Sequence, residues 1–324
     1  MTSSAANRPP SPDQGKSTDG QLSFRRVRPS QRHRVLALLL TGRADEHAAA
    51  LDSFLSFAGE ANLSLDELWV ATCGKELLAA MLIVPNAGRT AMAFLSPLRG
   101  PRQQKAVVGL ARTVCRSQDP KRMSMIQVLL DPGQHDEPRA LGEAGFSTLA
   151  KLLYMERPVR RTEGQVEFDP SLACVTWSGA NREIFANAIL ASYRNTLDCP
   201  GLVGLRGIDD IISSHMATGR FEPDLWLAWH TCDEPVAVML LNRVHRRDAI
   251  ELVYLGVHPA WRRRGLARQI LTHGLSLASL NRIKTMILVV DSVNKPALQL
   301  YRSFRFSSTA RRLALIYKVR GRKK

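Results

Sequence analysis

The chain has 324 residues and a formal net charge of +16 at pH 7, with 45% apolar and 23% charged residues. This balance is ordinary for a globular protein and excludes a wholly disordered chain, a collagen-like chain and a coiled coil. A chain of this length predicts about two domains. The basic excess favours polyanionic partners such as nucleic acid, anionic lipid or a phosphorylated cofactor, although a basic solvated surface fits the same numbers.

The first 20 residues are rich in Ser, Pro, Gly and Asp, so we expect a disordered tail there. No apolar run near the start reaches the roughly 20 residues of a membrane span, and no apolar segment of a secretion signal is present. We therefore expect no membrane partner. The five cysteines are scattered and odd in number, which favours the cytoplasm over a disulfide scaffold. No His or Cys cluster has zinc spacing, so we expect no metal.

In the first half, hydrophobic periodicity and turn residues predict a mixed series of elements. Strands are expected at residues 22–27, 68–72, 76–84, 90–95, 124–130 and 148–155, and helices at 31–40, 46–60, 103–116 and 138–144. Gly145 follows the last of these helices as a natural C-cap. A polar stretch with a proline at each end, residues 158–170, is expected to be an inter-domain linker.

The second half repeats this order of elements. Strands are expected at 172–177, 225–230, 235–244, 250–257, 285–290 and 312–319, and helices at 180–193, 209–218, 266–280 and 296–303. A repeat of roughly 160 residues in element order indicates a duplicated domain rather than a solenoid. We therefore expect one domain at 21–157, a second at 171–320 and a short basic tail at 321–324.

The segment from Val257 to Ala267 carries the first chemical signal. It joins the end of an apolar strand to a proline turn, three arginines and Gly265-x-Ala267 at the start of a helix. Small residues let a ligand approach the backbone. The first amides of a helix have no internal partners and carry the positive end of its dipole. This build predicts a diphosphate site, although a plain turn before a helix fits the short motif alone.

A second motif follows the buried strand at 285–290. Its residues have the spacing Asn-x-x-Ala-x-x-Leu-Tyr-x-x-x-x-Phe and are Asn294, Ala297, Leu300, Tyr301 and Phe306. Asn294 is placed to cap the helix that holds Ala297 and Tyr301. Two linked motifs at a sensible separation are a stronger signal than either one.

Together these motifs resemble the acyl-CoA signatures of the GCN5-related N-acetyltransferases (GNAT). The family pattern Val-x-Pro-x-x-(Gln/Arg)-x-x-Gly-x-(Gly/Ala) stands at Val257, Pro259, Arg262, Gly265 and Ala267. The second family pattern matches except that Arg305 replaces the glycine before Phe306. The resemblance covers about residues 172–319. It implies an α/β (α+β) fold with a central mixed sheet flanked by helices, in which strands four and five separate and admit CoA.

The resemblance also implies the co-substrate, acetyl-CoA or another acyl-CoA, and the residues that would bind it. The pyrophosphate would lie on the amides from Arg263 to Arg268, and backbone near Leu255 and Val257 would polarise the thioester carbonyl. The full expected set is Leu255, Val257, Arg262, Arg263, Arg264, Gly265, Leu266, Ala267, Arg268, Asn294, Ala297 and Tyr301.

Two side chains are candidates for catalysis. Tyr301 matches the position that the family often uses as general acid toward the CoA sulfur, although a core tyrosine with a bonded hydroxyl fits it too. Glu251 resembles the base of the histone-acetylating branch. Period two places Glu251 on the same side as Val253 and Leu255, and partial burial would raise its pKa toward neutrality.

Other interpretations of these positions stay open. Glu251 is alternatively a strand-edge residue paired with Arg243 or Arg246, and Tyr254 is a weaker candidate base. On the acceptor side, Asp198 would hold a cationic amine or, more simply, cap its own loop. Cys199 has no visible activating partner. The expected acceptor is a primary amine on a small molecule, peptide or protein, and the oligomeric state is not indicated.

The first half lacks both motifs. Its loop reads Ser96-Pro97-Leu98-Arg99-Gly100-Pro101-Arg102, and Pro101 removes an amide that would otherwise hold phosphate. We therefore expect a degenerate GNAT-like domain that packs on the second and helps to shape the acceptor site. The fold expected for the whole chain is two tandem acyl-CoA N-acyltransferase (GNAT-like) domains.

The leading hypothesis is an N-acetyltransferase whose C-terminal domain transfers an acetyl group directly within a ternary complex. The alternative is a non-catalytic module that senses acyl-CoA or binds RNA or ribosomes. Aromatic residues are only 6% of the chain and no aromatic–basic RNA-binding segment is present, so nucleic acid is the less favoured partner. A transferase that uses aminoacyl-tRNA would explain the charge, but the CoA loop argues against it.

Overall fold

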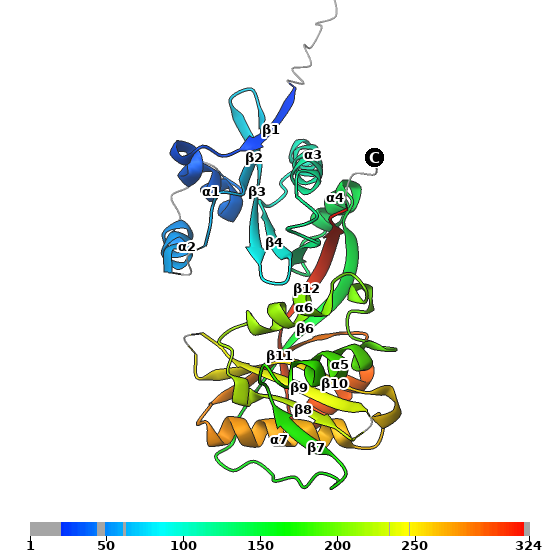
Figure 1. The fold of residues 1–324 in the computed structure, drawn as a ribbon. Helices are drawn as coiled ribbons and strands as arrows, with labels where there is room; N and C mark the ends of the chain where they lie inside the picture. The colour runs from blue at the N-terminus through cyan, green and yellow to red at the C-terminus, as the bar shows by residue number, and fades with distance from the viewer. Residues whose placement is uncertain (1–20, 44–48, 61–62, 233, 246, 321–324) are drawn as a thin grey trace, which may run out of the picture.

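The computed structural model describes residues 21–43, 49–60, 63–232, 234–245 and 247–320. The tails expected at 1–20 and 321–324 and the first residues of the helix expected at 46–60 lie outside the described residues. Within these ranges the strands form one mixed sheet of twelve, in the order β1-β2-β3-β4-β5-β12-β6-β11-β10-β9-β8-β7. Figure 1 shows the first half of the chain above the second, with β6 and β12 running between them.

The first half has the predicted sequence of elements. Its strands are β1 (Leu22–Arg26), β2 (Leu68–Cys73), β3 (Glu76–Asn86), β4 (Thr90–Leu95), β5 (Met125–Leu130) and β6 (Ser147–Pro158). Its helices are α1 (Arg32–Thr41), α2 (Ala49–Glu60), α3 (Pro101–Arg116) and α4 (Asp136–Ala144). Gly145 ends α4 in the left-handed conformation, at φ +104°, which confirms the predicted cap.

The second half follows the same plan. Its strands are β7 (Ala173–Thr176), β8 (Trp226–His230), β9 (Pro235–Arg243), β10 (Ala249–Val257), β11 (Thr285–Asp291) and β12 (Ser307–Lys318). Its helices are α5 (Arg182–Tyr193), α6 (Ile208–Met216), α7 (Leu266–Leu280) and α8 (Lys295–Ser303). Residues 159–172 connect β6 to β7 without a helix or strand.

The last strands of the two halves are exchanged. β12 lies between β5 and β6, and β6 lies between β12 and β11. Each half thus places its final strand beside the fifth strand of the other half. β12 accordingly pairs with two strands of the first half, β5 and β6, and, among the described strands, with none of the second. In Figure 1 the end of β12 lies beside α4 of the first half.

Helices cover both faces of the sheet in the second half. Met239 and Leu241 of β9 pack into one cluster with residues of α7, whereas Val238 and Leu240 pack into another with Phe185 of α5. A central strand that is buried on both faces is apolar throughout, which explains the unbroken apolar run of β9. These two layers hold β10 and α7 in place on either side of the site described below.

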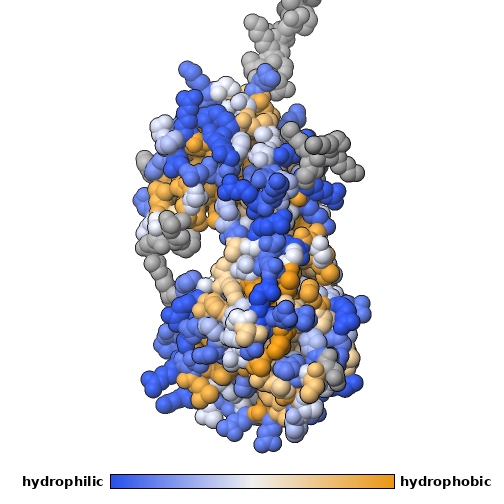
Figure 2. Space-filling model, in the orientation of Figure 1, coloured by the Kyte–Doolittle hydropathy of each residue, from blue (hydrophilic) through white to orange (hydrophobic). Residues whose placement is uncertain are grey.

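Much of the face seen in Figure 2 is hydrophilic, with smaller apolar areas between. Among the described residues, no helix is both long and apolar enough to cross a membrane. The same residues contain no group of three His, Cys, Asp or Glu side chains placed to hold a metal ion.

Candidate active site

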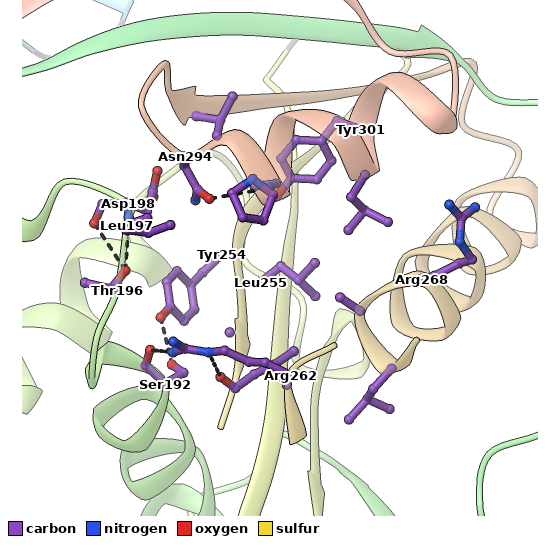
Figure 3. A pocket seen from close by; sticks show the side chains of 18 of the residues that line it. Ser192, Thr196, Leu197, Asp198, Tyr254, Leu255, Arg262, Arg268, Asn294 and Tyr301 are labelled. Atoms are coloured by element: carbon purple, nitrogen blue, oxygen red, sulfur yellow. Dashed lines mark hydrogen bonds between the residues drawn. The ribbon is translucent and has the colours of Figure 1, made fainter. Parts of the chain in front are cut away.

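The site begins where two parallel strands separate. β10 pairs with β11 only from Ala249 to Leu252, and its register with β9 shifts between Leu252 and Tyr254. Beyond that shift β10 keeps β9 as its partner while β11 pairs with β6. A cavity of about 620 Å³ opens between the separated strands and reaches the first turns of α7 and α8 (Figure 3).

A row of unpaired amides lies at one end of this cavity. Gly265 is the N-cap of α7 and adopts the left-handed conformation at φ +83°, which glycine reaches without a steric cost. A Cβ at Gly265 would meet no atom within 4 Å, so the backbone there faces open space. Within the described chain, no acceptor bonds to the backbone N–H groups of residues 263–267. Five successive free donors at a helix N-terminus form a site for an anion.

The predicted arginines take three different positions. Arg262 turns away from the amides and donates to the carbonyls of Ser192, Arg194 and Asn195, at 2.7–3.0 Å, and also to that of Val257. It thus ties the C-terminal end of α5 to the end of β10. Because its donors are taken by carbonyls, Arg262 shapes the site rather than offering a free cation.

The other arginines are exposed. Arg263 and Arg268 line the cavity, and Arg268 lies over the ring of Phe304 on the α7 side in Figure 3. Arg264 lies outside the cavity lining, with its guanidinium over the ring of Trp261. The cavity therefore carries positive charge on exposed side chains, in addition to its backbone amides.

Close packing of α5 on β10 forms another wall. A Cβ at Gly256 would collide with Ser192 of α5 and with the ring of Tyr254. Glycine at this point lets the helix approach the strand, and the Ser192 hydroxyl then lies 2.7 Å from the Tyr254 hydroxyl. Burial is the main cause that raises the pKa of Tyr254 well above its usual range, so the phenol stays neutral.

Tyr301 faces the same cavity from α8. Figure 3 shows it across the space from Tyr254 and Leu255. Asn294 is the N-cap of α8, and its side chain accepts a hydrogen bond of 3.3 Å from the Ala297 amide, as predicted. Burial first, and the nearby Asp198 carboxylate second, raise the pKa of Tyr301 above its usual range. The buried phenol is therefore protonated at neutral pH and available as a donor.

Asp198 joins two loops at the cavity. Its carboxylate accepts from the Asp291 amide at 3.0 Å, where β11 ends, and from the Asn294 side chain. Burial is the main cause that raises the pKa of Asp198. The carboxylate is thus used to hold the loop after α5 against the start of α8. This is a structural role close to the loop-cap interpretation of the sequence.

Glu251 lies outside the cavity lining. It pairs across the sheet with Asn242, whose side chain bonds to Trp226 in the cluster under α5. Val253 packs on that face as predicted, but the register shift moves Leu255 to the α7 face, so the prediction that Glu251 and Leu255 share a side is wrong.

Glu251 is partly buried in the sheet. Burial raises the pKa of its carboxyl. The Glu251 carboxylate in turn is one cause of the raised pKa of Tyr154 on β6, after burial and against the lowering effect of Arg312. Of the suggested pairings, Arg243 instead bonds to Glu222, and Arg246 lies outside the described residues.

Most of the predicted cofactor-binding residues meet at this cavity. Those that line it are Leu255, Val257, Arg262, Arg263, Gly265, Leu266, Ala267, Arg268, Asn294, Ala297 and Tyr301. Arg264 and Glu251 do not. The sequence analysis missed Ser192, which lines the cavity from α5. Nothing in a single sequence marks this residue, because it comes into the site only through the packing of α5 on Gly256.

The corresponding loop of the first half is closed. β4 and β5 pair in parallel only from Thr90 to Met92. Two of the loop amides that follow have acceptors within the chain. Leu98 donates to the buried carboxylate of Glu137 at 3.2 Å, and Arg99 donates to the Gln103 side chain at 2.9 Å. Pro101 offers no amide at all.

A comparison with protein-family models matches residues 203–306 to the Acetyltransferase (GNAT) family. This segment contains α6 to α8, both predicted motifs and most of the cavity lining. No curated protein matches the sequence.

Solved structures extend the likeness to the whole chain. A GCN5-related N-acetyltransferase from Sphaerobacter thermophilus is 16% identical with a TM-score of 0.57, over 93% of this chain and 96% of that one. This match shows that the GNAT fold extends over both halves, as the tandem prediction requires.

Two further structures resemble the chain. A GCN5-related glucosamine N-acetyltransferase region of a fungal multi-domain GH3 β-N-acetylglucosaminidase is 12% identical, with a TM-score of 0.54 over 91% of this chain and 38% of that one. A tandem GNAT protein from the clavulanic acid biosynthesis pathway is 13% identical, with a TM-score of 0.48 over 94% of this chain and all of that one.

Proposed function

We propose that the C-terminal GNAT domain transfers an acetyl group from acetyl-CoA to a primary amine, by direct attack within a ternary complex. The observation that carries this proposal is the row of free amides at residues 263–267, at the end of a cavity of about 620 Å³. A pyrophosphate would accept hydrogen bonds from these amides, with Arg263 and Arg268 beside it.

Acetyl-CoA supplies the acyl thioester, and the chain supplies donors and a base. Tyr301 is the candidate general acid, because it faces the cavity and its raised pKa keeps the hydroxyl protonated. A protonated phenol can donate to the sulfur as the thiolate leaves. Beyond Leu252, β10 has no β11 partner, so its backbone can contribute a donor toward the thioester carbonyl.

The amine must lose a proton before or during its attack. We infer that Glu251 is the base, since burial raises its pKa toward the range in which a carboxylate accepts a proton near neutrality. Glu251 lies on the sheet face that carries α5 and α6 in the second half. On that face Ile287, Val289 and Tyr154 are only half buried, so an acceptor could reach this side of the sheet. The amine would approach from this side and the cofactor from the other.

Titration calorimetry of the whole chain with acetyl-CoA tests the proposal, with CoA and ATP as controls at physiological salt. We expect one site per chain with micromolar affinity, followed by release of CoA when a panel of primary amines is added. The panel should contain small amines, lysine peptides and peptides with free N-termini. Absence of acetyl-CoA binding would refute the proposal, and binding without turnover on the panel would support a non-catalytic sensor instead.

A further inference from the structure

The two halves meet at a polar contact that the proposed chemistry does not use. The turn between β3 and β4 in the first half, residues 87–89 (the 87–89 turn), lies against α6 of the second half. Ser214 of α6 donates to the Ala87 carbonyl at 3.0 Å, and Arg89 pairs with Asp210 at 3.5 Å. A Cβ at Gly88, where φ is +72°, would collide with the Asp210 carbonyl and the Ser214 hydroxyl. The turn is therefore fitted to this helix.

The helix that the turn contacts carries an aromatic group into the site wall. His215, next to Ser214, stacks on the ring of Tyr254 with 5.6 Å between the centroids and 25° between the planes. Its Nε2 is buried and has no hydrogen-bond partner in the described chain. Burial, followed by the Arg206 guanidinium, lowers the pKa of His215 to about 4, so the ring packs as a neutral imidazole.

Arg206 joins the turn to the same wall. Its guanidinium donates to the Ser214 hydroxyl and lies 3.5 Å from the Gly88 carbonyl. The charge of Arg206 also acts on the pKa of Tyr193, which packs edge-on against Tyr254. Tyr254 lines the cavity. Contacts therefore run without a gap from the first half through α6 to a residue of the candidate active site.

The C-terminal end of α6 has a second anchor, which comes from the second half itself. Asn242, buried on β9, donates to the carbonyls of His215 and Thr218 at the C-terminal end of the helix. The preceding turn of α6 is held by α5 and by the 87–89 turn. The position of α6 therefore depends on the 87–89 turn of the first half as well as on the packing of Ile211 and Ile212 in the second.

We propose that the 87–89 turn of the first half is a positioning element of the C-terminal active site: it holds α6 so that His215 stays stacked on Tyr254 in the wall facing the acceptor. The assignment of this wall to the acceptor rests on the proposed function. The half without its own phosphate loop would thus take part in the reaction by fixing the geometry of the other half.

Two matched pairs of variants test this in the full chain. Ser214→Ala removes the hydroxyl that bonds to Ala87 and to Arg206, and Ser213→Ala changes an exposed neighbour on the same helix. Gly88→Val places a side chain against α6, whereas Gly74→Val has a similar backbone conformation at φ +58° with no atom within 4 Å of its Cβ. The members of each pair carry comparable local costs, so a difference between them reports on the contact with α6.

The readout that needs no substrate is hydrogen–deuterium exchange of the peptide covering α6. We expect exchange to rise about fivefold in Ser214→Ala and further in Gly88→Val, with both controls like the wild type, since one lost hydrogen bond has about this effect on a local opening. On the amine panel, KM for the amine should rise while calorimetric affinity for acetyl-CoA stays unchanged.

The outcomes separate this inference from the proposed function. Equal exchange within both pairs would overturn the positioning role, whatever the protein binds. Faster exchange with an unchanged KM for the amine would overturn the link to the acceptor wall. If the wild-type chain fails to bind acetyl-CoA, the proposed function fails, while the exchange experiment still decides whether the turn positions α6.

Discussion

The two halves share the same order of strands and helices, but they differ in the loop between the fourth strand and the helix that follows it. In the second half, the amides of residues 263–267 have no partner in the described chain and face a cavity. In the first half, Glu137 and Gln103 take the amides of Leu98 and Arg99. A carboxylate of the chain thus occupies a donor of the kind that a phosphate would need. The fold alone does not make a cofactor site, because the site depends on which backbone donors remain free.

One feature is nevertheless common to both loops. Arg99 donates to the Thr41 carbonyl at the end of α1, just as Arg262 donates to Ser192 at the end of α5. In both halves an arginine of the loop thus holds the C-terminal end of the first α-helix of that half, α1 or α5. This arginine contact is present in the first half, where Leu98 and Arg99 have no free amides. Its presence there supports a structural role for Arg262.

The largest effect is expected from a variant that blocks the free amides of residues 263–267 in the second half. Gly265→Val places a branched side chain at φ +83°, in front of the free amides. We expect the Kd for acetyl-CoA to rise at least about 100-fold, from backbone strain together with lost contacts to the phosphates. Calorimetry measures the effect, with Gly74→Val as the control for strain alone. An unchanged Kd would remove the cofactor assignment.

The next effect concerns the acid. Tyr301→Phe removes only the hydroxyl, so we expect kcat to fall about 100-fold or more while the Kd for acetyl-CoA changes less than about twofold. Tyr317→Phe, at a tyrosine of β12 that packs on Phe146 in the first half, is the matched control. If kcat is the same in both variants, Tyr301 is not the acid.

A pH profile tests the base. Glu251 must be ionised to accept a proton, and burial raises its pKa above the ordinary value of 4.5. The rate should therefore fall as pH drops through this raised pKa, at a higher pH than for an exposed glutamate. Glu251→Gln should lower kcat/KM at neutral pH about 100-fold and remove this acidic limb. The surface variant Glu143→Gln is the control and should keep the wild-type fall in rate at low pH. If Glu251→Gln keeps it as well, another group is responsible for that fall.

The smallest effect is expected in the closed loop of the first half. Glu137→Ala leaves the Leu98 amide without its buried partner, and we expect a loss of about 1–3 kcal/mol in the free energy of unfolding. Glu143→Ala, an exposed residue of the same helix, should change it by less than about 0.5 kcal/mol. Urea unfolding measures both. Acetyl-CoA should still bind at one site, because Pro101 leaves the loop short of donors, and a second site would show that Glu137 alone keeps it closed.

The sequence predicted the parts of the site that are encoded locally. Gly265 at a helix start, Asn294 as a cap and Tyr301 on the same helix follow from short-range spacing, and the structure brings all three to one cavity. The register shift near Val253 was not predictable, since it breaks the period-two rule that placed Leu255 beside Glu251. The partners of Arg262 depend on how α5 packs, which no local pattern contains.

The exchange of the last strands between the halves could not be predicted from the sequence either. The strand patterns of β6 and β12 were visible in the sequence, and the structure shows strands there. Alternation along a strand indicates which residues face a core, but it does not say which strand lies alongside. The pairing of β12 with β5 joins residues far apart in the chain, and such long-range choices are set by the whole fold.

The interleaved position of β12 has a consequence for how the protein is made. β5 has β4 on one edge and β12 on the other, so within the first half its second edge has no partner until residues 307–318 have been synthesised. Domains in tandem commonly fold one after another during synthesis. Here the first half keeps an unpaired edge on β5 until β12 is available. The two halves therefore complete their sheets at the same time. Both halves should then melt together in a single cooperative transition, and a cut between residues 158 and 170 should leave two fragments that are each incomplete.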